Sequence, residues 1–472
     1  MSRNNRSHTG LKVFLILVIL VLIAGTAFMI KLSLDLVDQV PETRPADTTI
    51  TLPVPEKTEP TETEAPTETT MPEPEKVVAT ASISAQGDLL MHKMLFDTNS
   101  LCHQSDGSYD FSSIFQYLTD TLKTYDYSIA NLETTFGGDD FPYQGNPSFN
   151  CPDPFINSVA DAGYDLLLTA NNHSYDTLMT GITRTLETVR GAGLQTLGTR
   201  LSEDELRYSI LEINGIKIGM VCYTYTSGLS NAGKPRLNGN TPVENPELVN
   251  WYSNTKPQKL YDEMEVILAD MKENGADATM LFIHWGNEYE LKQNSHQQKQ
   301  AQALCDLGVD VIVGGHPHVV QPVEVLTSTS DPEHNTLCIY SMGNAVSNQR
   351  KENIPQCGTA HVEDGILFSI TFEKYSDGAV YIAEADILPT WCNKHNSDGG
   401  MEYNILPLFK DTEDQWQENY NLTDDQFTAC QKSWDRTMAI VGEGLTRMQE
   451  FLAQEKSDRE TYYLELVSNP AA

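Results

Sequence analysis

Four short polar segments of this chain each follow an apolar run rich in β-branched residues, and this pairing constrains the fold more than any other feature. The runs, which are typical of buried strands, are Ala79–Ala85, Tyr164–Leu168, Ala278–Ile283 and Val309–Val313. The polar segments that follow them are Gly87-Asp88, Thr169-Ala170-Asn171-Asn172-His173, His284-Trp285-Gly286 and Gly315-His316-Pro317-His318. In an open α/β sheet, ligands bind just beyond the carboxyl ends of the strands. The pattern therefore predicts one cleft that collects Asp, Asn and His side chains, as a metal site requires.

Helical patterns alternate with these strand-like runs. The clearest ones, Lys256–Asn274 and Ser295–Leu307, are each followed by a glycine, which is a common helix stop. Asn214-Gly215-Ile216 lies between two apolar runs and indicates a hairpin, and later runs predict antiparallel strands. This alternation predicts a layered α/β fold for residues 77–392.

The N-terminal region predicts a membrane anchor. Residues 13–30 carry no charged side chain over 18 positions, which is close to the length that spans a bilayer. Three basic residues precede them, so residues 1–12 are expected to stay in the cytoplasm while the rest is exported. A cleaved signal peptide ending near Gly25-Thr26-Ala27 is the alternative, and the length of the run favours the anchor. We expect a single-pass protein of the cell membrane with its C-terminal domain outside the cell.

Two further regions flank the predicted α/β domain. Residues 31–76 predict a linker, because residues 41–76 hold eight Pro, ten Thr and nine acidic residues with no apolar periodicity. Residues 393–472 are more polar and predict a helical C-terminal extension, with Thr423–Glu455 as its clearest helix.

The net charge of −35 limits the partners of the chain. Nucleic acid is excluded as an expected partner, because binding its phosphates needs Lys and Arg. An anionic polymer would need a local basic or metal-rich site to offset the same repulsion. The eight cysteines include no C-x-x-C pair, which excludes a zinc ribbon.

Acidic residues close two of the predicted strands. Asp88 is a candidate metal ligand, with a helix N-cap as the alternative. Asn131-Leu132-Glu133 ends the strand Tyr127–Leu132, so Glu133 could bind metal or act as an acid or base; a solvated side chain is the structural alternative. His92, four residues after Asp88, could reach the same cleft or lie on the surface.

The segment Asn171-Asn172-His173 offers an amide oxygen as a metal ligand and an adjacent imidazole as a proton donor. Asp176 lies three residues further on and could orient His173. The alternative is an Asx-turn that carries a hydrogen-bonded histidine.

The segment after Ala278–Ile283 carries four candidates. His284 is a candidate ligand, although a core histidine is the alternative. Trp285 and Tyr289 are expected to form an aromatic wall for the substrate, and Glu288 is a candidate catalytic carboxylate.

Gly314-Gly315-His316-Pro317-His318 is the most specific segment. Its glycines let the backbone turn tightly, and its two histidines offer the commonest metal ligand near neutral pH. Asn344 follows another predicted strand, Leu337–Ser341, and could contact substrate or simply form a turn.

These side chains predict the metal better than the substrate. A mixture of Asp, Asn and His suits one or two divalent ions such as Mn, Fe or Zn, and two such ions could clamp an ester. The chain has no G-x-S-x-G elbow, no Walker loop and no H-E-x-x-H helix. The sequence therefore gives no motif for a serine hydrolase, a P-loop NTPase or a zinc protease of these types.

In this order the motifs resemble the bacterial capsule-synthesis CapA family, which is similar to the calcineurin-like metallophosphatases. The six motifs, spread over roughly residues 80–390, are Gly87-Asp88, Asn131-Leu132-Glu133, Asn171-Asn172-His173, His284-Trp285-Gly286, Gly315-His316-Pro317-His318 and Ser341-Met342-Gly343-Asn344. The resemblance implies a four-layer α/β/β/α sandwich of metallophosphatase type.

The same resemblance implies roles for individual residues. The positions that match metal ligands are Asp88, Glu133, Asn172, His284, His316 and His318, and His173 matches the general acid or transition-state stabiliser. His92, Asn131, Trp285, Tyr289 and Asn344 remain candidates for substrate binding, and Asp176 and Glu288 for catalysis. The chain departs from the phosphatase pattern at Leu90, where a histidine is expected, and at Asn131-Leu132-Glu133, which replaces G-D-x-x-D.

The family is linked to poly-γ-glutamate capsule synthesis, so the resemblance implies a role in synthesis, export or anchoring of this or a similar anionic surface polymer. We expect a metal-dependent hydrolase of phosphoester or amide bonds, together with possible membrane subunits of a polymer synthase as partners. A non-catalytic scaffold or polymer-binding subunit is the first alternative, because the phosphatase motifs are incomplete. A general extracellular phosphodiesterase is the second.

Overall fold

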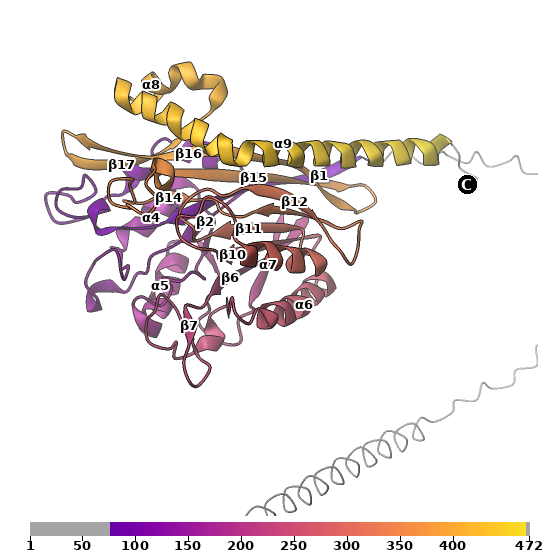
Figure 1. The fold of residues 1–472 in the computed structure, drawn as a ribbon, viewed down its shortest axis with the longest axis horizontal. Helices are drawn as coiled ribbons and strands as arrows, with labels where there is room; N and C mark the ends of the chain where they lie inside the picture. The colour runs from indigo at the N-terminus through magenta and orange to yellow at the C-terminus, as the bar shows by residue number, and fades with distance from the viewer. Residues whose placement is uncertain (1–75, 469–472) are drawn as a thin grey trace, which may run out of the picture. The chain divides into compact units, whose positions relative to one another are not determined.

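Two β-sheets packed face to face carry the fold of residues 76–468, the part of the chain that the computed structural model describes (Figure 1). The predicted membrane anchor at residues 13–30 and nearly all of the predicted linker at residues 31–76 lie outside the described residues. Within residues 76–468, no helix combines the length and the apolar character that a bilayer crossing requires.

The first sheet has eight strands and is parallel in one half and antiparallel in the other. Its order is β17 (Gly400–Pro407), β16 (Val380–Ser397), β15 (Asp364–Tyr375), β1 (Val77–Leu89), β2 (Tyr127–Leu132), β3 (Leu166–Leu168) and β4 (Gln195–Leu197), with β14 (Asn344–Val346) also paired to β1. The strands β1 to β4 run parallel, whereas β15, β16 and β17 are antiparallel to their neighbours. The carboxyl ends of the parallel strands therefore meet at one edge of the sheet.

The second sheet has seven strands and a parallel centre. Its order is β12 (Val323–Thr327), β13 (Asn335–Ile339), β11 (Val311–Gly315), β10 (Ala278–His284), β6 (Ile216–Tyr225) and β5 (Tyr208–Ile213), with β9 (Trp251–Tyr252) paired to β6. The strands β6, β10, β11 and β13 run parallel, and β5 and β12 pair antiparallel at the two edges. A separate hairpin joins β7 (Gly228–Leu229) to β8 (Pro235–Arg236).

Apolar side chains fill the space between the sheets and the space under the outer helices. The inner faces of both sheets form one buried cluster, to which β1 contributes Ile83 and β10 contributes Phe282. The outer face of the first sheet is covered by α2 (Ser112–Phe115), α3 (Thr119–Leu122) and α4 (Pro154–Ala162), and that of the second by α6 (Gln258–Glu273) and α7 (Ser295–Asp306). The helix α5 (Leu178–Gly191) packs on the segment around Val243. The result is a mixed α/β sandwich with helices on both outer faces, as the alternation in the sequence predicts.

The C-terminal helix α9 (Asp424–Ser468) joins the two sheets. It packs on β16 of the first sheet and on the edge strand β12 of the second, and it runs along the first sheet (Figure 1). Its side chains Val441, Leu445 and Met448 belong to the buried cluster between the sheets. A Cβ atom at Gly444 would lie 2.1 Å from the Val323 carbonyl oxygen, which shows how closely the helix backbone approaches β12. The remaining short helices are α8 (Trp416–Asn419), η1 (Lys93–Leu95), η2 (Gly138–Asp140), η3 (Pro246–Leu248), η4 (Ala360–Glu363) and η5 (Lys410–Gln415).

Two sequence predictions need correction. The boundary at residue 392 falls inside β16, and β17 follows it, so residues 393–407 complete the first sheet rather than begin a helical extension. Residues 393–402 are almost all polar or glycine, which hides the strand pattern. The sequence of residues 111–124 also predicts one helix, and the structure has the two short helices α2 and α3 there.

Candidate metal centre

Polar side chains from both sheets meet at the edge where the parallel strands end. Asp88 lies near the end of β1, Glu133 directly after β2, and Asn172 in the loop after β3. His284 ends β10, and the segment that follows β11 carries His316 and His318. All six side chains are buried, with at most 4% of each residue exposed. The structure therefore brings together the six residues that the family resemblance implies as metal ligands.

Two glycines allow the backbones to approach closely enough for this arrangement. A Cβ atom at Gly87 would lie 1.9 Å from the Gly343 carbonyl oxygen, and one at Gly314 would lie 2.1 Å from the Tyr340 carbonyl oxygen. Both distances are shorter than non-bonded atoms tolerate. The glycines before the metal-site residues are thus required by packing between neighbouring strands.

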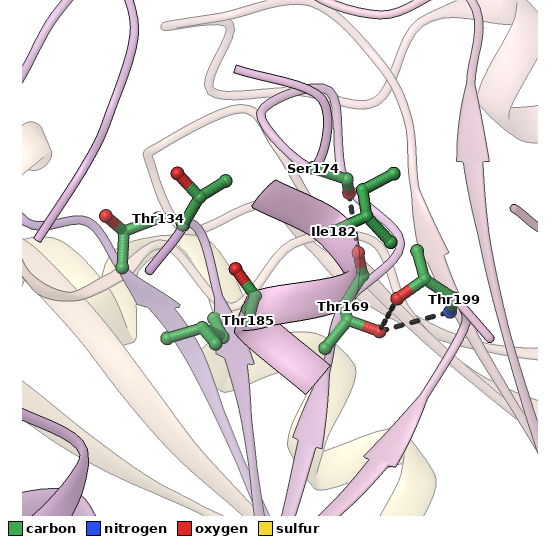
Figure 2. A pocket seen from close by; sticks show the side chains of 8 residues that line it. Thr134, Thr169, Ser174, Ile182, Thr185 and Thr199 are labelled. Carbon is green, nitrogen blue, oxygen red and sulfur yellow. Dashed lines mark hydrogen bonds between the residues drawn. The ribbon is translucent and has the colours of Figure 1, made fainter. Parts of the chain in front are cut away.

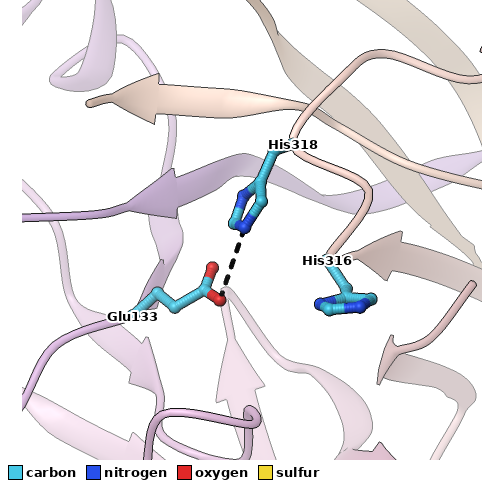
Figure 3. Close-up of side chains that lie close together, drawn as sticks. All are labelled: Glu133, His316 and His318. Carbon is cyan, nitrogen blue, oxygen red and sulfur yellow. Dashed lines mark ion pairs between the residues drawn. The ribbon is translucent and has the colours of Figure 1, made fainter. Parts of the chain in front are cut away.

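The two histidines after β11 are held in a strained backbone conformation. His316 has a φ of 97° and His318 a φ of 56°, in the left-handed region that non-glycine residues rarely adopt. Gly314 and Gly315 do not share this conformation, so the expected glycine turn is a turn at the histidines themselves. Such strain persists where the surroundings fix it and is concentrated at functional sites. It directs both imidazoles toward Glu133 (Figure 3).

The Glu133 carboxylate lies at the centre of the cluster. Its Oε1 atom lies 3.4 Å from Nε2 of His284 and 4.0 Å from Nε2 of both His173 and His318. Neither carboxylate oxygen has a hydrogen-bond partner among the described residues. Burial, and next the charge of Asp88, raise the pKa of Glu133 well above its usual value. A buried carboxylate without a partner is costly, which indicates that a cation completes the site.

Asp88 and His318 form a buried pair on one side of Glu133. The Asp88 Oδ2 atom lies 3.1 Å from His318 Nδ1, and Asp88 Oδ1 accepts a hydrogen bond of 2.7 Å from the Asn131 side-chain amide. Burial alone would lower the pKa of His318, but the hydrogen bond and charge of Asp88 outweigh it and raise that pKa. Asn344 Oδ1 also lies 3.0 Å from His318 Nδ1. These contacts leave His318 Nε2 directed toward Glu133.

His284 and His316 form the other side and are uncharged near neutral pH. The His284 Nε2 atom lies 2.7 Å from Asn172 Oδ1, and burial lowers the pKa of His284 to about 3. Burial also lowers the pKa of His316 well below its usual value, and its Nδ1 atom has no hydrogen-bond partner among the described residues. Neutral imidazole is the form that binds metal ions.

The residues present fit a metal site. Two groups, Glu133 with His316 and His318, and Asp88 with Glu133 and His284, each offer ligand atoms within 4.8 Å of one another. Both groups share Glu133, whose oxygens are unpartnered like Nδ1 of His316. Imidazole and carboxylate together suit borderline divalent ions, so the site can hold one or two of them.

His173 lies at the border of this cluster and is oriented by Asp176. The His173 Nδ1 atom lies 2.7 Å from Asp176 Oδ2, while its Nε2 atom faces Glu133. Asp176 Oδ2 also accepts a 2.7 Å hydrogen bond from the Phe149 amide, and its Oδ1 accepts bonds from the side-chain amides of Asn238 (3.0 Å) and Asn240 (3.2 Å). The imidazole is thus fixed with one nitrogen toward the cleft.

A small cavity lined with hydroxyl groups lies behind the loop that carries His173 (Figure 2). Its volume of about 10 Å³ has room for about one water molecule. Thr169 Oγ1 lies 2.7 Å from Thr199 Oγ1, and Ser174 Oγ donates to the Thr169 carbonyl and accepts from the Asn171 amide at 2.9 Å. These hydrogen bonds hold the loop against the sheet and so position the side chains of Asn172 and His173.

One candidate, Trp285, lies elsewhere than the sequence suggests. Trp285 is fully buried in the core under the outer helices, where its indole donates a 2.8 Å hydrogen bond to the Tyr340 carbonyl, so it forms no wall of the cleft. Consecutive residues at a strand end point to opposite faces, and His284 takes the inner one. Asn344 is 1% exposed and contacts His318 within the site. Glu288 is exposed, and its charge helps to raise the pKa of both Glu133 and His318.

The remaining substrate-binding candidates occupy separate positions. Tyr289 lies at the rim, with its ring centroid 6.2 Å from that of His318 and its hydroxyl accepting a 3.2 Å hydrogen bond from Gln349. His92 is half-buried, and its ring lies 5.1 Å from the Phe149 ring. Asn131 is buried and holds Asp88.

Sequence reasoning missed several residues of the site. Tyr225 ends β6, beside β10, and its ring centroid lies 4.8 Å from that of His316. The rule that places candidates at strand ends would have found it. Phe149, whose ring lies 4.7 Å from His173, and the two asparagines on Asp176 come from loops without a recognisable pattern.

Comparisons with known proteins agree with the motif order. The model of the bacterial capsule synthesis protein PGA_cap family matches residues 82–349. The PGA biosynthesis protein CapA of Bacillus subtilis (strain 168) is 27% identical over 319 residues, covering 66% of this chain and 76% of that protein. The capsule biosynthesis protein CapA of Bacillus anthracis is 26% identical over 246 residues, covering 51% of this chain and 55% of that protein.

Similar solved structures are more distant. The NAD nucleotidase of Haemophilus influenzae gives a TM-score of 0.37 at 13% identity, covering 81% of this chain and 68% of that one. A purple acid phosphatase from yellow lupin (Lupinus luteus) seeds gives 0.28 at 10% identity, covering 65% and 53%. Likeness at these TM-scores says nothing about activity. The family model, in contrast, covers more than half of the chain and includes all six strand-end positions, so the chain belongs to the bacterial capsule synthesis protein PGA_cap family.

Proposed function

We propose that this protein is a metal-dependent hydrolase that acts in synthesis, export or anchoring of poly-γ-glutamate or a similar anionic capsule polymer. The observation that carries the hydrolase is the Glu133 carboxylate, which is buried without a hydrogen-bond partner and faces three imidazoles. The polymer comes from the printed description of the family and from the names of the two Bacillus relatives.

The residues that would hold one or two ions of Mn, Fe or Zn are Asp88, Glu133, Asn172, His284, His316 and His318. A divalent ion supplies Lewis acidity toward the substrate and increases the acidity of water. The histidines His284 and His316 are uncharged, so they can donate lone pairs without first losing a proton.

His173 is the proposed proton donor to the leaving group. Asp176 accepts from Nδ1 and stabilises the imidazolium form, in which Nε2 carries a proton toward the cleft. The hydrogen bonds from Phe149, Asn238 and Asn240 to Asp176 keep the carboxylate in place. An amide or phosphoester leaving group beside Glu133 would thus find a fixed proton source.

The likeness to metallophosphatases remains part of the proposal. The layers of helix, sheet, sheet and helix and the ligands at strand ends support it. Leu90 is buried where the phosphatase pattern places a histidine, and Asn131 supports Asp88 instead of supplying a carboxylate. These differences favour a bond other than a simple phosphate ester.

The membrane location is proposed from the sequence. The uncharged residues 13–30 and the basic residues before them support an anchor with the catalytic domain outside the cell. Protease added to intact cells should remove the C-terminal domain, and full protection of the domain would contradict this orientation.

Metal content of the purified full-length chain, measured by elemental mass spectrometry, tests the hydrolase. We expect one or two transition-metal ions per chain, lost in the His316→Ala/His318→Ala double variant together with hydrolysis of γ-linked glutamate oligomers. A folded chain that stays free of metal after reloading with Mn, Fe and Zn would contradict the proposal and favour a scaffold. Cleavage of small phosphodiesters without cleavage of the oligomers would favour a general phosphodiesterase.

A further inference from the structure

Positively charged side chains near the cleft are important for binding an anion in this protein, because 66 acidic residues outnumber 31 Lys and Arg. An acidic polymer is repelled by most of such a surface. A substrate of this kind must find positive charge close to the bond that reacts. Lys394, on β16, carries such a charge and is connected to the metal centre through hydrogen-bonded side chains.

Asn348 and Gln349 connect Lys394 to the metal centre. Gln349 Oε1 accepts a 3.0 Å hydrogen bond from Asn344, the residue that contacts His318. The next residue, Asn348, accepts a 2.7 Å hydrogen bond from Lys394 Nζ on its side-chain oxygen. Three hydrogen-bond contacts and one chain step therefore connect the ammonium group to His318, a candidate metal ligand.

His92 closes the other side of this region. The His92 Nδ1 atom lies 3.3 Å from both the Asn348 backbone amide nitrogen and the Leu90 carbonyl oxygen, and the His92 ring packs against Phe149, which itself contacts His173. Burial lowers the pKa of His92 to about 4, so the ring is neutral near pH 7. No hydrogen bond within residues 76–468 engages its Nε2 atom, which leaves that nitrogen for a ligand.

Lys394 carries a positive charge that no carboxylate neutralises by direct contact. Among residues 76–468 it has no ion-pair partner, whereas the neighbouring Arg350 lies 3.4 Å from Glu363. Burial, and next the charge of Arg350, lower the pKa of Lys394, while the charges of Glu352 and Glu363 act in the opposite direction. The Tyr403 ring supports it, with Nζ 5.7 Å from the ring centroid. One uncompensated positive charge matches one negative charge on a ligand.

We propose that Lys394 and His92 form an anion subsite that binds a carboxylate of an acidic peptide chain while a neighbouring bond of that chain lies at the metal centre. The proposal rests on the proposed function, because it places the substrate of that site. A single ammonium beside a neutral imidazole fits the single charge of a carboxylate better than the double charge of a phosphate monoester. Lys394 positions and selects the substrate and takes no part in proton transfer.

Calorimetric titration of the full-length, metal-loaded chain tests this subsite. The probes are a γ-linked glutamate oligomer and the same oligomer with every free carboxylate converted to an amide. We expect Lys394→Ala to weaken binding of the acidic oligomer by about tenfold or more, because a charge-assisted hydrogen bond is lost. Binding of the amide oligomer should change little, and Lys394→Arg should retain most of the affinity. Lys299→Ala, which removes an exposed charge from α7 on the far outer layer, is the matched control.

Two results would overturn the subsite. One is equal affinity of wild type and Lys394→Ala for the acidic oligomer, including no detectable binding by either. The other is an equal loss for the acidic and amide oligomers, which would indicate a general packing defect; unchanged metal content and unfolding midpoint exclude misfolding. The proposed hydrolase fails separately, since a chain that binds the acidic oligomer through Lys394 but never cleaves it keeps the subsite and loses the catalytic role.

Discussion

Two buried carboxylates, Glu133 at the metal centre and Asp364 under α9, show how differently the same chemical group can be used. Asp364 accepts hydrogen bonds from Ser433 Oγ (2.6 Å) and from Nε (2.7 Å) and Nη2 (2.6 Å) of Arg436. Glu133 accepts none among the described residues, although both residues are at most 1% exposed. The hydrogen-bonded Asp364 carboxylate attaches α9 to the first sheet. The Glu133 carboxylate has no such partner among the described residues, as expected of a group that binds a cation.

The largest expected effect is on Glu133, and it should appear only when metal is present. In Glu133→Gln we expect loss of tightly held metal and of hydrolysis, because the shared ligand of both groups is gone. The unfolding free energy of the metal-free chain should hardly change, since Glu133 accepts no hydrogen bond among the described residues that the substitution would break. Elemental mass spectrometry and urea unfolding with and without metal measure both effects. Strong destabilisation of the metal-free chain would remove the contrast with Asp364.

Arg436 should matter with or without metal. Arg436→Met leaves Asp364 buried without its cation, and such a change typically costs about 3 kcal/mol in the free energy of unfolding. The exposed pair Arg447–Glu443 on the same helix provides the control, because Arg447→Met should cost well under 1 kcal/mol. Similar losses in both variants would show that Asp364 is no better anchored than a surface residue.

Asp176 extends the comparison to a carboxylate that is hydrogen-bonded, as Asp364 is, but lies next to the metal centre, as Glu133 does. Asp176→Asn should lower kcat by about 100-fold, because His173 loses the group that stabilises its imidazolium form. Metal content should stay at the wild-type level, since Asp176 belongs to neither ligand group. Steady-state kinetics on the oligomer and elemental analysis of the same sample separate the two. A fall in metal content would move Asp176 into the ligand set.

The smallest expected effect concerns pH. Burial raises the pKa of Asp364 from 3.8 to about 6, against the opposing effect of Arg436. The folded state therefore holds its proton to higher pH than the unfolded state, so this group's contribution to stability is fully present below pH 4. It is lost as pH rises through about 6, because the carboxyl of the unfolded state titrates about two pH units lower. Asp364→Asn should flatten the curve of unfolding free energy in that window, and an unchanged curve would assign the slope to other groups.

The sequence predicted the parts of the fold and the site that depend on burial along a strand. Ala79–Ala85 and Ala278–Ile283 are continuous apolar runs, so β1, β10 and the polar residues at their ends could be identified. The direction of a side chain at a strand end could not, which is why Trp285 was placed in the cleft although it packs in the core. Asn238 and Lys394 lie far along the chain from the residues they support, and only tertiary contacts bring them there.

The helix α9 was predicted too short for a similar reason. The expected range Thr423–Glu455 ends close to Leu452, the last residue of the helix in the buried cluster between the sheets. Beyond that point the sequence offers no alternation of apolar and polar residues to follow. The sheet strands before it, in residues 393–407, were missed because residues 393–402 are almost all polar or glycine, which hides the strand pattern.

The place of α9 also has a consequence for the order in which this protein can fold. Val441, Leu445 and Met448 fill the space between β16 and β12, strands that are complete by Ser397. A chain emerging from the ribosome or a translocation channel therefore carries an open apolar surface until the last helix is available. Long-range contacts of this kind form late and leave partly folded chains prone to association. The packing of α9 thus determines when the apolar surface of the newly made sandwich is covered and its tendency to aggregate falls.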